Sequence, residues 1–318
     1  MKVLANDGIS AAGESKLKEF GFEVLTNTIE QDKLISYINE NDISALLVRS
    51  ATQVRKDIID SCPGLKIIGR GGVGMDNIDV EYARSTGIKV INTPAASSQS
   101  VAELVLGSLF SMVRMTYDAN RQMPEKGDVE FKALKKKYSK GLELRGKTLG
   151  IIGTGRIGAA TASYALGIGM KVIGFDVFMP KASAFVPIPD GSVMEIPIEM
   201  CALNELYKSA DFITVHVPAQ ADGKALITTN ELNTMKDGVY LVNASRGGII
   251  DEGDLITALN ENKVAGACID VFNNEPTPRK DLIAHPKVIA TPHIGAATLE
   301  AQDRIGIELA DQIHEILN

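Results

Sequence analysis

Short apolar runs rich in β-branched residues alternate with helical patterns along the first third of the chain. The runs predict strands at 2–5, 22–25, 44–48, 65–69 and 90–94. The apolar spacing between these runs predicts helices near 11–20, 31–41, 54–61 and 79–86. Because strands that alternate with helices form parallel sheets covered on both faces, this region predicts a doubly wound α/β domain.

A second alternating series begins at "KTLGIIG" (147–153) and ends at "KVIATPH" (287–293). The apolar segments between these two are "KVIGFDV", "FITVHVP", "VYLVNAS" and "AGACIDVF". They predict a second doubly wound parallel sheet, so the chain is expected to be an α/β protein with two such domains. Four prolines fall in 179–198, and this stretch is expected to form a long loop.

The last 21 residues, 298–318, have the pattern of an amphipathic helix. Its apolar side carries Ile305, Leu309, Ile313 and Ile316. We expect this helix to return to the first domain, which would make that domain discontinuous. The expected boundaries are 1–96 with 291–318 for the first domain and 97–290 for the second.

The segment from about 98 to 121 predicts one long helix that is apolar around much of its circumference. Its apolar positions are Leu104, Leu106, Leu109, Phe110, Met112, Val113 and Met115. This is more apolar surface than one domain needs, so we expect the helix to pack against a second copy in a homodimer.

Composition narrows the class of protein further. The chain is 45% hydrophobic and 23% charged, as in soluble globular proteins, and it has no apolar run of the roughly 18 residues that a membrane helix needs. A net charge of −7 argues against a nucleic-acid partner. The three cysteines lack C-x-x-C spacing, so neither a disulfide framework nor a metal site is expected. A cytoplasmic protein fits this composition.

The sequence "GTGRIG" contains glycines at 153, 155 and 158, directly after an apolar run and before a helical pattern. In this context the three glycines serve a tight turn, the approach of backbone to a pyrophosphate, and close packing of helix on strand. Asp176 ends the next strand, where a carboxylate accepts hydrogen bonds from ribose hydroxyls and repels a 2′-phosphate. The motif therefore predicts a dinucleotide site that prefers NAD to NADP.

Polar residues follow three later strands of the second series. Arg246 follows one strand, Asp270 and Glu275 follow another, and His293 follows the last. Taken singly, these side chains could be a surface arginine, loop carboxylates and a turn histidine. Because the carboxyl ends of parallel strands meet at one edge of a sheet, their joint occurrence beside a dinucleotide loop predicts a catalytic site.

The segments "GIIGTGRIG", "NASRGGIID", "IDVFNNEP" and "TPHIGAAT" resemble the D-isomer-specific 2-hydroxyacid dehydrogenase family. The segments "LKIIGRGGVGMDNID" and "INTPAASSQSVAELVLG" look most like its D-3-phosphoglycerate dehydrogenase members. The resemblance implies a Rossmann NAD-binding domain and a discontinuous, flavodoxin-like substrate domain with a cleft between them. It also implies oxidation of D-3-phosphoglycerate to 3-phosphohydroxypyruvate, the first step of serine biosynthesis.

The resemblance also assigns roles to individual residues. It implies that Arg246 orients the substrate carboxylate, that His293 is the general acid/base and that Glu275 pairs with this histidine. The implied cofactor-binding residues are Gly153, Gly155, Arg156, Ile157, Gly158, Asp176, Pro218, Ala244, Asp270 and Gly295. The implied substrate-binding residues are Arg49, Arg70, Gly72, Val73, Gly74 and Gln302.

Two alternatives remain open on the sequence alone. The first is another enzyme of the same family, namely a hydroxypyruvate or glyoxylate reductase or a D-lactate dehydrogenase, because Ser97 and Gln99 depart from common residues at those positions. The second is a non-enzymatic protein that senses NAD, like the corepressors of this fold. The sequence ends just after the last helix, so we expect no C-terminal regulatory domain and no inhibition by serine through one.

Overall fold

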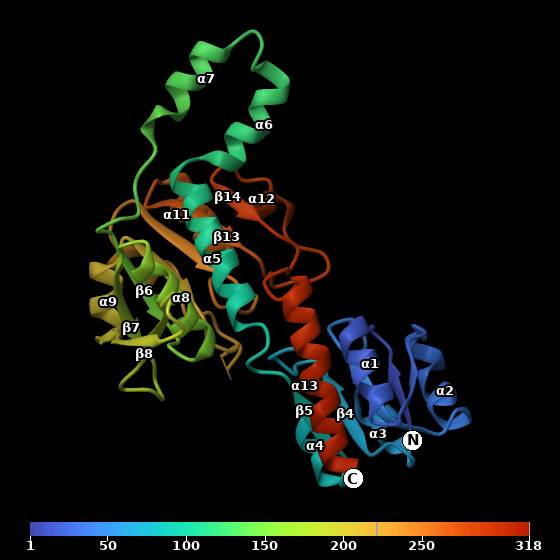
Figure 1. Cartoon of the computed structure of the whole chain (residues 1–318). Helices are drawn as coiled ribbons and strands as arrows, with labels where there is room; N and C mark the ends of the chain where they lie inside the picture. The colour runs from blue at the N-terminus through green and yellow to red at the C-terminus, as the bar shows by residue number, and fades with distance from the viewer. Residues whose placement is uncertain (221, 318) are drawn as a thin grey trace. The chain divides into compact units, whose positions relative to one another are not determined.

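Two compact units make up the structure, a computed structural model that describes residues 1–220 and 222–317 (Figure 1). Unit 1 comprises Met1–Ser100 and Ala296–Asn318, and unit 2 comprises Val101–Gly295. The chain therefore leaves unit 1, builds unit 2 and then returns to unit 1. The boundaries expected from the sequence lie at 96/97 and 290/291.

Unit 1 contains a five-stranded parallel sheet with the strand order β2-β1-β3-β4-β5. The strands are β1 (Lys2–Ala5), β2 (Glu23–Leu25), β3 (Ile43–Val48), β4 (Ile67–Arg70) and β5 (Lys89–Asn92). The helices are α1 (Ala11–Glu19), the 3₁₀ turn η1 (Gln31–Lys33), α2 (Leu34–Glu40), α3 (Lys56–Ser61), α4 (Val80–Ser85) and α13 (Leu299–Leu317). This order is the flavodoxin-like one, as expected.

Apolar side chains cover both faces of the unit 1 sheet. One face packs on α2, α3 and α4, and the other packs on α1 and α13. Helices α1 and α13 approach very closely, because a Cβ atom on Gly13 would lie 2.5 Å from the Cα of Gly306. Leu309 and Ile313 are buried beneath α13, whereas Ile316, expected on the same side, is 37% exposed.

Unit 2 contains a seven-stranded parallel sheet with the order β10-β7-β6-β11-β12-β13-β14. The strands are β6 (Thr148–Ile152), β7 (Lys171–Phe175), β10 (Glu199–Met200), β11 (Phe212–Val215), β12 (Val239–Asn243), β13 (Val264–Ile269) and β14 (Val288–Ala290). This is the dinucleotide-binding order with a seventh strand, so the expected α/β fold class is confirmed.

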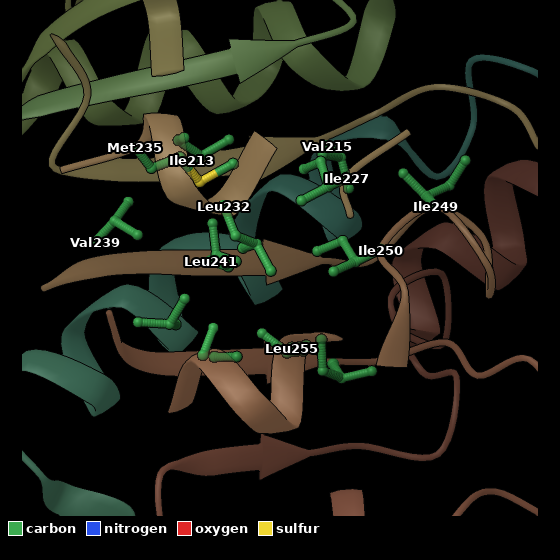
Figure 2. Packing of buried hydrophobic residues seen from close by; sticks show 14 of the residues in the cluster. Ile213, Val215, Ile227, Leu232, Met235, Val239, Leu241, Ile249, Ile250 and Leu255 are labelled. Carbon is green, nitrogen blue, oxygen red and sulfur yellow. The ribbon is translucent and has the colours of Figure 1, made fainter. Parts of the chain in front are cut away.

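Helices cover both faces of the unit 2 sheet. The helical elements of unit 2 are α5 (Ser98–Val113), which begins in unit 1, α6 (Thr116–Lys126), α7 (Phe131–Lys137), the 3₁₀ turn η2 (Tyr138–Lys140), α8 (Arg156–Gly167), α9 (Leu203–Ser209), α10 (Thr229–Thr234), α11 (Glu252–Asn260) and α12 (Lys280–Ile283). Figure 2 shows one apolar layer, in which Ile213 and Leu241 of the sheet lie near Leu232 of α10 and Leu255 of α11. Burying each such side chain stabilises the fold by about 1.5–3 kcal/mol.

Two sequence-based expectations in unit 2 are wrong. The single helix expected at 98–121 is two helices, because Met115 takes a left-handed conformation (φ 52°) that separates α5 from α6. The stretch 179–198 is not a long loop, since β8 (Ser183–Pro187) and β9 (Val193–Pro197) pair there as an antiparallel ribbon. The ribbon lies on α8, where the Ser163 hydroxyl donates to the Phe185 carbonyl at 2.7 Å.

Helices α6 and α7, green in Figure 1, extend away from the rest of unit 2. None of the residues of α6 is buried.

Across the described residues, 1–220 and 222–317, every helix is too short or too polar to span a bilayer.

Candidate active site

The glycine loop after β6 has the geometry that a pyrophosphate needs. Gly153 has φ 92°, and a Cβ atom there would lie 2.4 Å from the His216 carbonyl oxygen. A Cβ atom on Gly158 would lie 2.1 Å from the Gly153 oxygen, so the helix and the loop touch through glycine. At Gly155 the space for a Cβ atom is open, which leaves room for a ligand against the backbone.

Helix α8 begins directly after this loop, and Gly155 at its N-cap has no side chain to satisfy the first amides. Unsatisfied amides at a helix start attract phosphate oxygens. Arg156 is exposed and Ile157 is partly buried on the first turn. These three residues therefore suit the cofactor's phosphates.

Asp176 follows β7 at the edge of the same loop. One carboxylate oxygen accepts the Thr154 N–H at 2.8 Å, and the other accepts the N–H groups of Phe178 and Met179 at 2.8 and 3.1 Å. These bonds fix the carboxylate beside the glycine loop, where it suits a ribose and disfavours a 2′-phosphate. The open glycine, the uncapped helix and this carboxylate together fit NAD.

His293 lies in the turn after β14 with a left-handed backbone (φ 55°). Its Nδ1 is 2.8 Å from Glu275 Oε2, and the two side chains are 39% and 37% exposed. The other oxygen of Glu275 accepts the Phe272 N–H at 2.9 Å, which holds the carboxylate in place. When Nδ1–H donates to Glu275, Nε2 becomes the basic nitrogen of the neutral ring.

Asp270, at the end of β13, organises the turn that carries His293. This side chain is 1% exposed. Its Oδ1 accepts the Thr291 hydroxyl at 2.6 Å and the Ile294 N–H at 2.8 Å, and its Oδ2 accepts the Gly295 N–H at 2.9 Å. The structure therefore places Asp270 as a brace for this turn, while its expected contact with the cofactor stays a prediction.

Arg246 follows β12, the neighbour of β13 in the sheet. The Asn243 amide donates to the Arg246 carbonyl at 2.9 Å, and Arg246 Nη1 donates to the Ser245 carbonyl at 2.7 Å. A Cβ atom on Gly247 would lie 2.1 Å from the Phe272 oxygen, so this loop touches the segment that leads to Glu275. The structure thus brings the three expected catalytic segments to one sheet edge.

Pro218 and Ala244 follow β11 and β12 at the same edge. Pro218 is exposed and Ala244 is partly buried. Gly295 is buried beside the Asp270 carboxylate. All ten expected cofactor residues therefore lie in unit 2, in loops at the carboxyl ends of its strands or at the start of α8.

The expected substrate residues all lie in unit 1. Arg49 and Arg70 occur at the ends of the neighbouring strands β3 and β4, and Arg70 Nη2 is 3.4 Å from the Ser50 hydroxyl. Gly72 has φ 140°, and a Cβ atom there would lie 1.9 Å from Arg70 Nη1, so the guanidinium lies directly over this glycine.

The other three substrate residues differ in their surroundings. Val73 is 39% exposed, and its carbonyl accepts the Asn92 amide at 2.7 Å, while Gly74 is half-buried next to it. The Gln302 side-chain amide donates to the Ala296 carbonyl at 2.8 Å, and Gln302 lines a small pocket together with Arg49. Within unit 1, Arg49 and Gln302 therefore share a pocket.

Sequence reasoning missed Asn243 and Glu252, which support the loops that carry Arg246 and Glu275. Glu252 is 6% exposed and accepts the Asn273 N–H at 2.9 Å, two residues before Glu275. The helical spacing of the sequence could have indicated that Glu252 is buried, because Glu252 shares a face of α11 with the buried Leu255 and Leu259. Asn243 sits inside a strand motif and gave no separate signal.

A family model described as "D-isomer specific 2-hydroxyacid dehydrogenase, NAD binding domain" matches residues 106–295. Hydroxypyruvate reductase of Thermotoga maritima is 44% identical over 298 residues, which cover 93% of this chain and 91% of that protein. D-3-phosphoglycerate dehydrogenase of Methanocaldococcus jannaschii is 40% identical over 317 residues, and this chain spans only 57% of that protein's length.

Among solved structures, the TT0316 protein of Thermus thermophilus superposes with a TM-score of 0.82 at 30% identity. The match covers 98% of this chain and 94% of that one. The family model, the two relatives and this fold agree with each other and with the geometry of the glycine loop. The chain belongs to the D-isomer-specific 2-hydroxyacid dehydrogenase family, and it is an NAD-dependent oxidoreductase.

Proposed function

We propose that this protein oxidises D-3-phosphoglycerate to 3-phosphohydroxypyruvate with NAD, the reaction that opens serine biosynthesis. The observation that carries the chemistry is the 2.8 Å contact between His293 Nδ1 and Glu275 Oε2 at the sheet edge that also holds the glycine loop. An imidazole held by a carboxylate is suited to remove a hydroxyl proton.

His293 Nε2 takes the proton of the C2 hydroxyl, and the electron pair of the broken O–H bond becomes the second bond between C2 and its oxygen. NAD, which the glycine loop 153–158 and Asp176 would hold, would supply the acceptor for the hydride that leaves C2. Glu275 stabilises the imidazolium that forms, as a carboxylate partner does for an orienting histidine. Arg246 binds the substrate carboxylate, since a guanidinium stays charged and presents two parallel donors.

The phosphate of the substrate is assigned to Arg49 and Arg70. What supports this is their occurrence at the ends of two adjacent strands of unit 1, together with the backbone amides of 72–74. Two guanidinium groups suit a dianion better than a neutral hydroxymethyl group. The match with the Methanocaldococcus relative, whose name states this activity, covers all of this chain and 57% of that protein.

A panel of 2-hydroxy acids tests the substrate directly. We expect kcat/KM for D-3-phosphoglycerate to exceed that for D-glycerate and D-lactate, and Arg49→Ala to raise the KM for the phosphorylated acid much more than the KM for D-lactate. Equal effects of Arg49→Ala on phosphorylated and unphosphorylated acids would remove the phosphate role.

Reduction of hydroxypyruvate is the second candidate function. The Thermotoga relative with that name is 44% identical, and the match covers 91% of its length, against 57% for the Methanocaldococcus dehydrogenase. If the chain has this activity, NADH oxidation with hydroxypyruvate will have a higher kcat/KM than with 3-phosphohydroxypyruvate. The same panel, run in the direction of reduction, separates the two functions.

We also propose a homodimer formed through α5, α6 and unit 2. Apolar side chains on and after these helices are exposed, namely Phe110, Met123, Val129, Phe131 and Leu142. Extended helices with exposed apolar residues are typical of surfaces that a partner covers.

The three cysteines are free thiols, which supports a reducing compartment, and we propose the cytoplasm.

A further inference from the structure

The turn Arg49–Thr52, which follows β3, is bound by two side chains from other parts of unit 1. Asp7 Oδ2 accepts the N–H groups of Arg49 and Thr52 at 2.6 and 3.1 Å. Asn77 Nδ2 donates to the carbonyl oxygens of the same two residues at 2.9 and 2.7 Å. Asp7 and Asn77 therefore bind the donors and the acceptors at both ends of the turn.

The Thr52 hydroxyl extends this arrangement. It donates to Asp7 Oδ1 at 2.5 Å and accepts the Asn6 amide at 2.8 Å. Asn6 also exchanges two hydrogen bonds with the backbone of Ile29, at 2.8 and 3.1 Å. Asn6, Thr52 and Asn77 are 2%, 4% and 8% exposed, so a lost partner would leave a buried polar group unsatisfied. The turn is thus confined to one conformation.

This turn lies where ligands bind in open α/β sheets. Asp7 follows β1 and Arg49 follows β3, and the strand order of the sheet reverses between these two strands. Arg49 lines a small pocket with Gly8 and Gln302. Asn77 comes from the loop after β4, which also carries the amides of 72–74.

We propose that Asp7 and Asn77 are positioning residues that orient Arg49 toward the anionic group of the substrate farthest from C2. The inference rests on the proposed role of Arg49 in substrate binding. Fixing both the N–H and the carbonyl of Arg49 leaves only its side chain to be ordered when the substrate binds. The hydrogen bonds of Asp7 go to two backbone N–H groups and one hydroxyl, which stabilises the turn without using the Arg49 guanidinium.

A double-mutant cycle tests whether Asp7 acts through Arg49. Steady-state kinetics are measured for the wild type, Asp7→Ala, Arg49→Ala and the double variant, with the 2-hydroxy acid that the wild type oxidises best. We expect Asp7→Ala to raise KM by about tenfold with kcat within about threefold, because lost ground-state binding appears in KM. In the Arg49→Ala background we expect Asp7→Ala to change KM by less than about twofold.

Conservative variants and matched controls distinguish a role in positioning Arg49 from a general disturbance of the unit 1 fold. Asp7→Asn keeps a carbonyl oxygen for the two N–H groups, so we expect it to restore KM to within about threefold of wild type. Asp60→Ala and Asn39→Ala remove similar bonds elsewhere in unit 1, to the Tyr82 hydroxyl and the Ser61 carbonyl, and we expect both to keep the wild-type KM. If Asp7→Ala does not fold, Asn77→Ala replaces it in the same cycle.

An equal rise in KM in both backgrounds would overturn the inference, as would an Arg49→Ala variant with unchanged KM for every acid oxidised. Failure of the proposed substrate looks different. In that case the wild type oxidises a 2-hydroxy acid with a different second anionic group in place of 3-phosphoglycerate, and the cycle still gives a coupling between Asp7 and Arg49 on that acid.

Discussion

Glu275 holds the His293 ring through a single 2.8 Å contact, and both side chains are partly open to solvent. Such a pair contributes little to stability, because exposed ion pairs are weak, so its value lies in orienting the imidazole. The backbone supports this orientation, since Asp270 bonds three groups of the turn that carries His293.

Replacing Glu275 by Gln tests the orienting role. The amide keeps the shape of the side chain but removes the charge that stabilises the imidazolium, so we expect kcat to fall by about 10–100-fold. The affinity for NAD, measured by fluorescence titration, should not change. Glu300→Gln, an exposed glutamate at the start of α13, is the matched control, and an unchanged kcat in Glu275→Gln would contradict the role of the pair.

His216 gives a prediction about pH and stability. Burial lowers the pKa of His216 to about 4. An unfolded histidine titrates near 6.5, so between these values the unfolded chain binds more protons and stability falls as the pH falls. Between pH 7 and pH 4, we expect the free energy of unfolding of His216→Asn to fall by about 1–3 kcal/mol less than that of the wild type, as measured by urea unfolding. Parallel curves for the two proteins would contradict this.

At the scale of elements, the packing of α1 on α13 depends on two glycines that face each other. A Cβ atom on Gly306 would lie 2.6 Å from the Ser10 hydroxyl oxygen and 2.9 Å from the Gly13 Cα. We expect Gly306→Ala to destabilise the protein by about 1–3 kcal/mol, since neither helix can move apart without losing buried contacts.

Gly107→Ala, in a helix outside the α1–α13 pair, is the control for Gly306→Ala. Gly107 lies inside α5, and a Cβ atom there would have no heavy atom within 4 Å. Alanine favours helix over glycine by up to about 1 kcal/mol, so this variant should be as stable as the wild type or more so. Thermal denaturation of both variants decides the matter, and equal melting temperatures would show that the close approach is unimportant.

Apart from the two-residue strand β10, the strands of both sheets could be predicted from the sequence because buried parallel strands are short, continuous apolar runs, such as 149–152 and 44–48. The β8–β9 ribbon could not, because its prolines indicated a loop. Pro187 and Pro197 occupy ends of the two strands, where proline is tolerated in a ribbon. The helix break at Met115 could not be predicted from the residue type, since methionine is a good helix former.

The candidate site was predictable to a different degree in each unit. Polar residues at strand ends in unit 2 pointed to Arg246, Glu275 and His293, because parallel strands align their carboxyl ends. Their supports were not predictable, since Asn243 and Glu252 act through side chain–backbone bonds that depend on tertiary contacts. In unit 1, Asp7 and Asn77 escaped notice for the same reason.

At the scale of the whole molecule, the exposed apolar residues of α5–α7 bear on assembly. Phe131 is 57% exposed and Met123 is 43% exposed. We expect light scattering after gel filtration to give the mass of a dimer at micromolar concentration, and Met123→Asp with Phe131→Asp to shift it toward a monomer. A wild-type monomer would contradict the proposed dimer.

The chemistry itself is tested most directly by NADH formation from paired D- and L-2-hydroxy acids, measured with the wild type and with His293→Ala. We expect the wild type to reduce NAD with a D-enantiomer, and His293→Ala to lower kcat by about 10²–10⁴ while it still binds NAD. Full activity in His293→Ala, or a wild type that reduces NAD with none of the D-acids, would contradict the proposed mechanism.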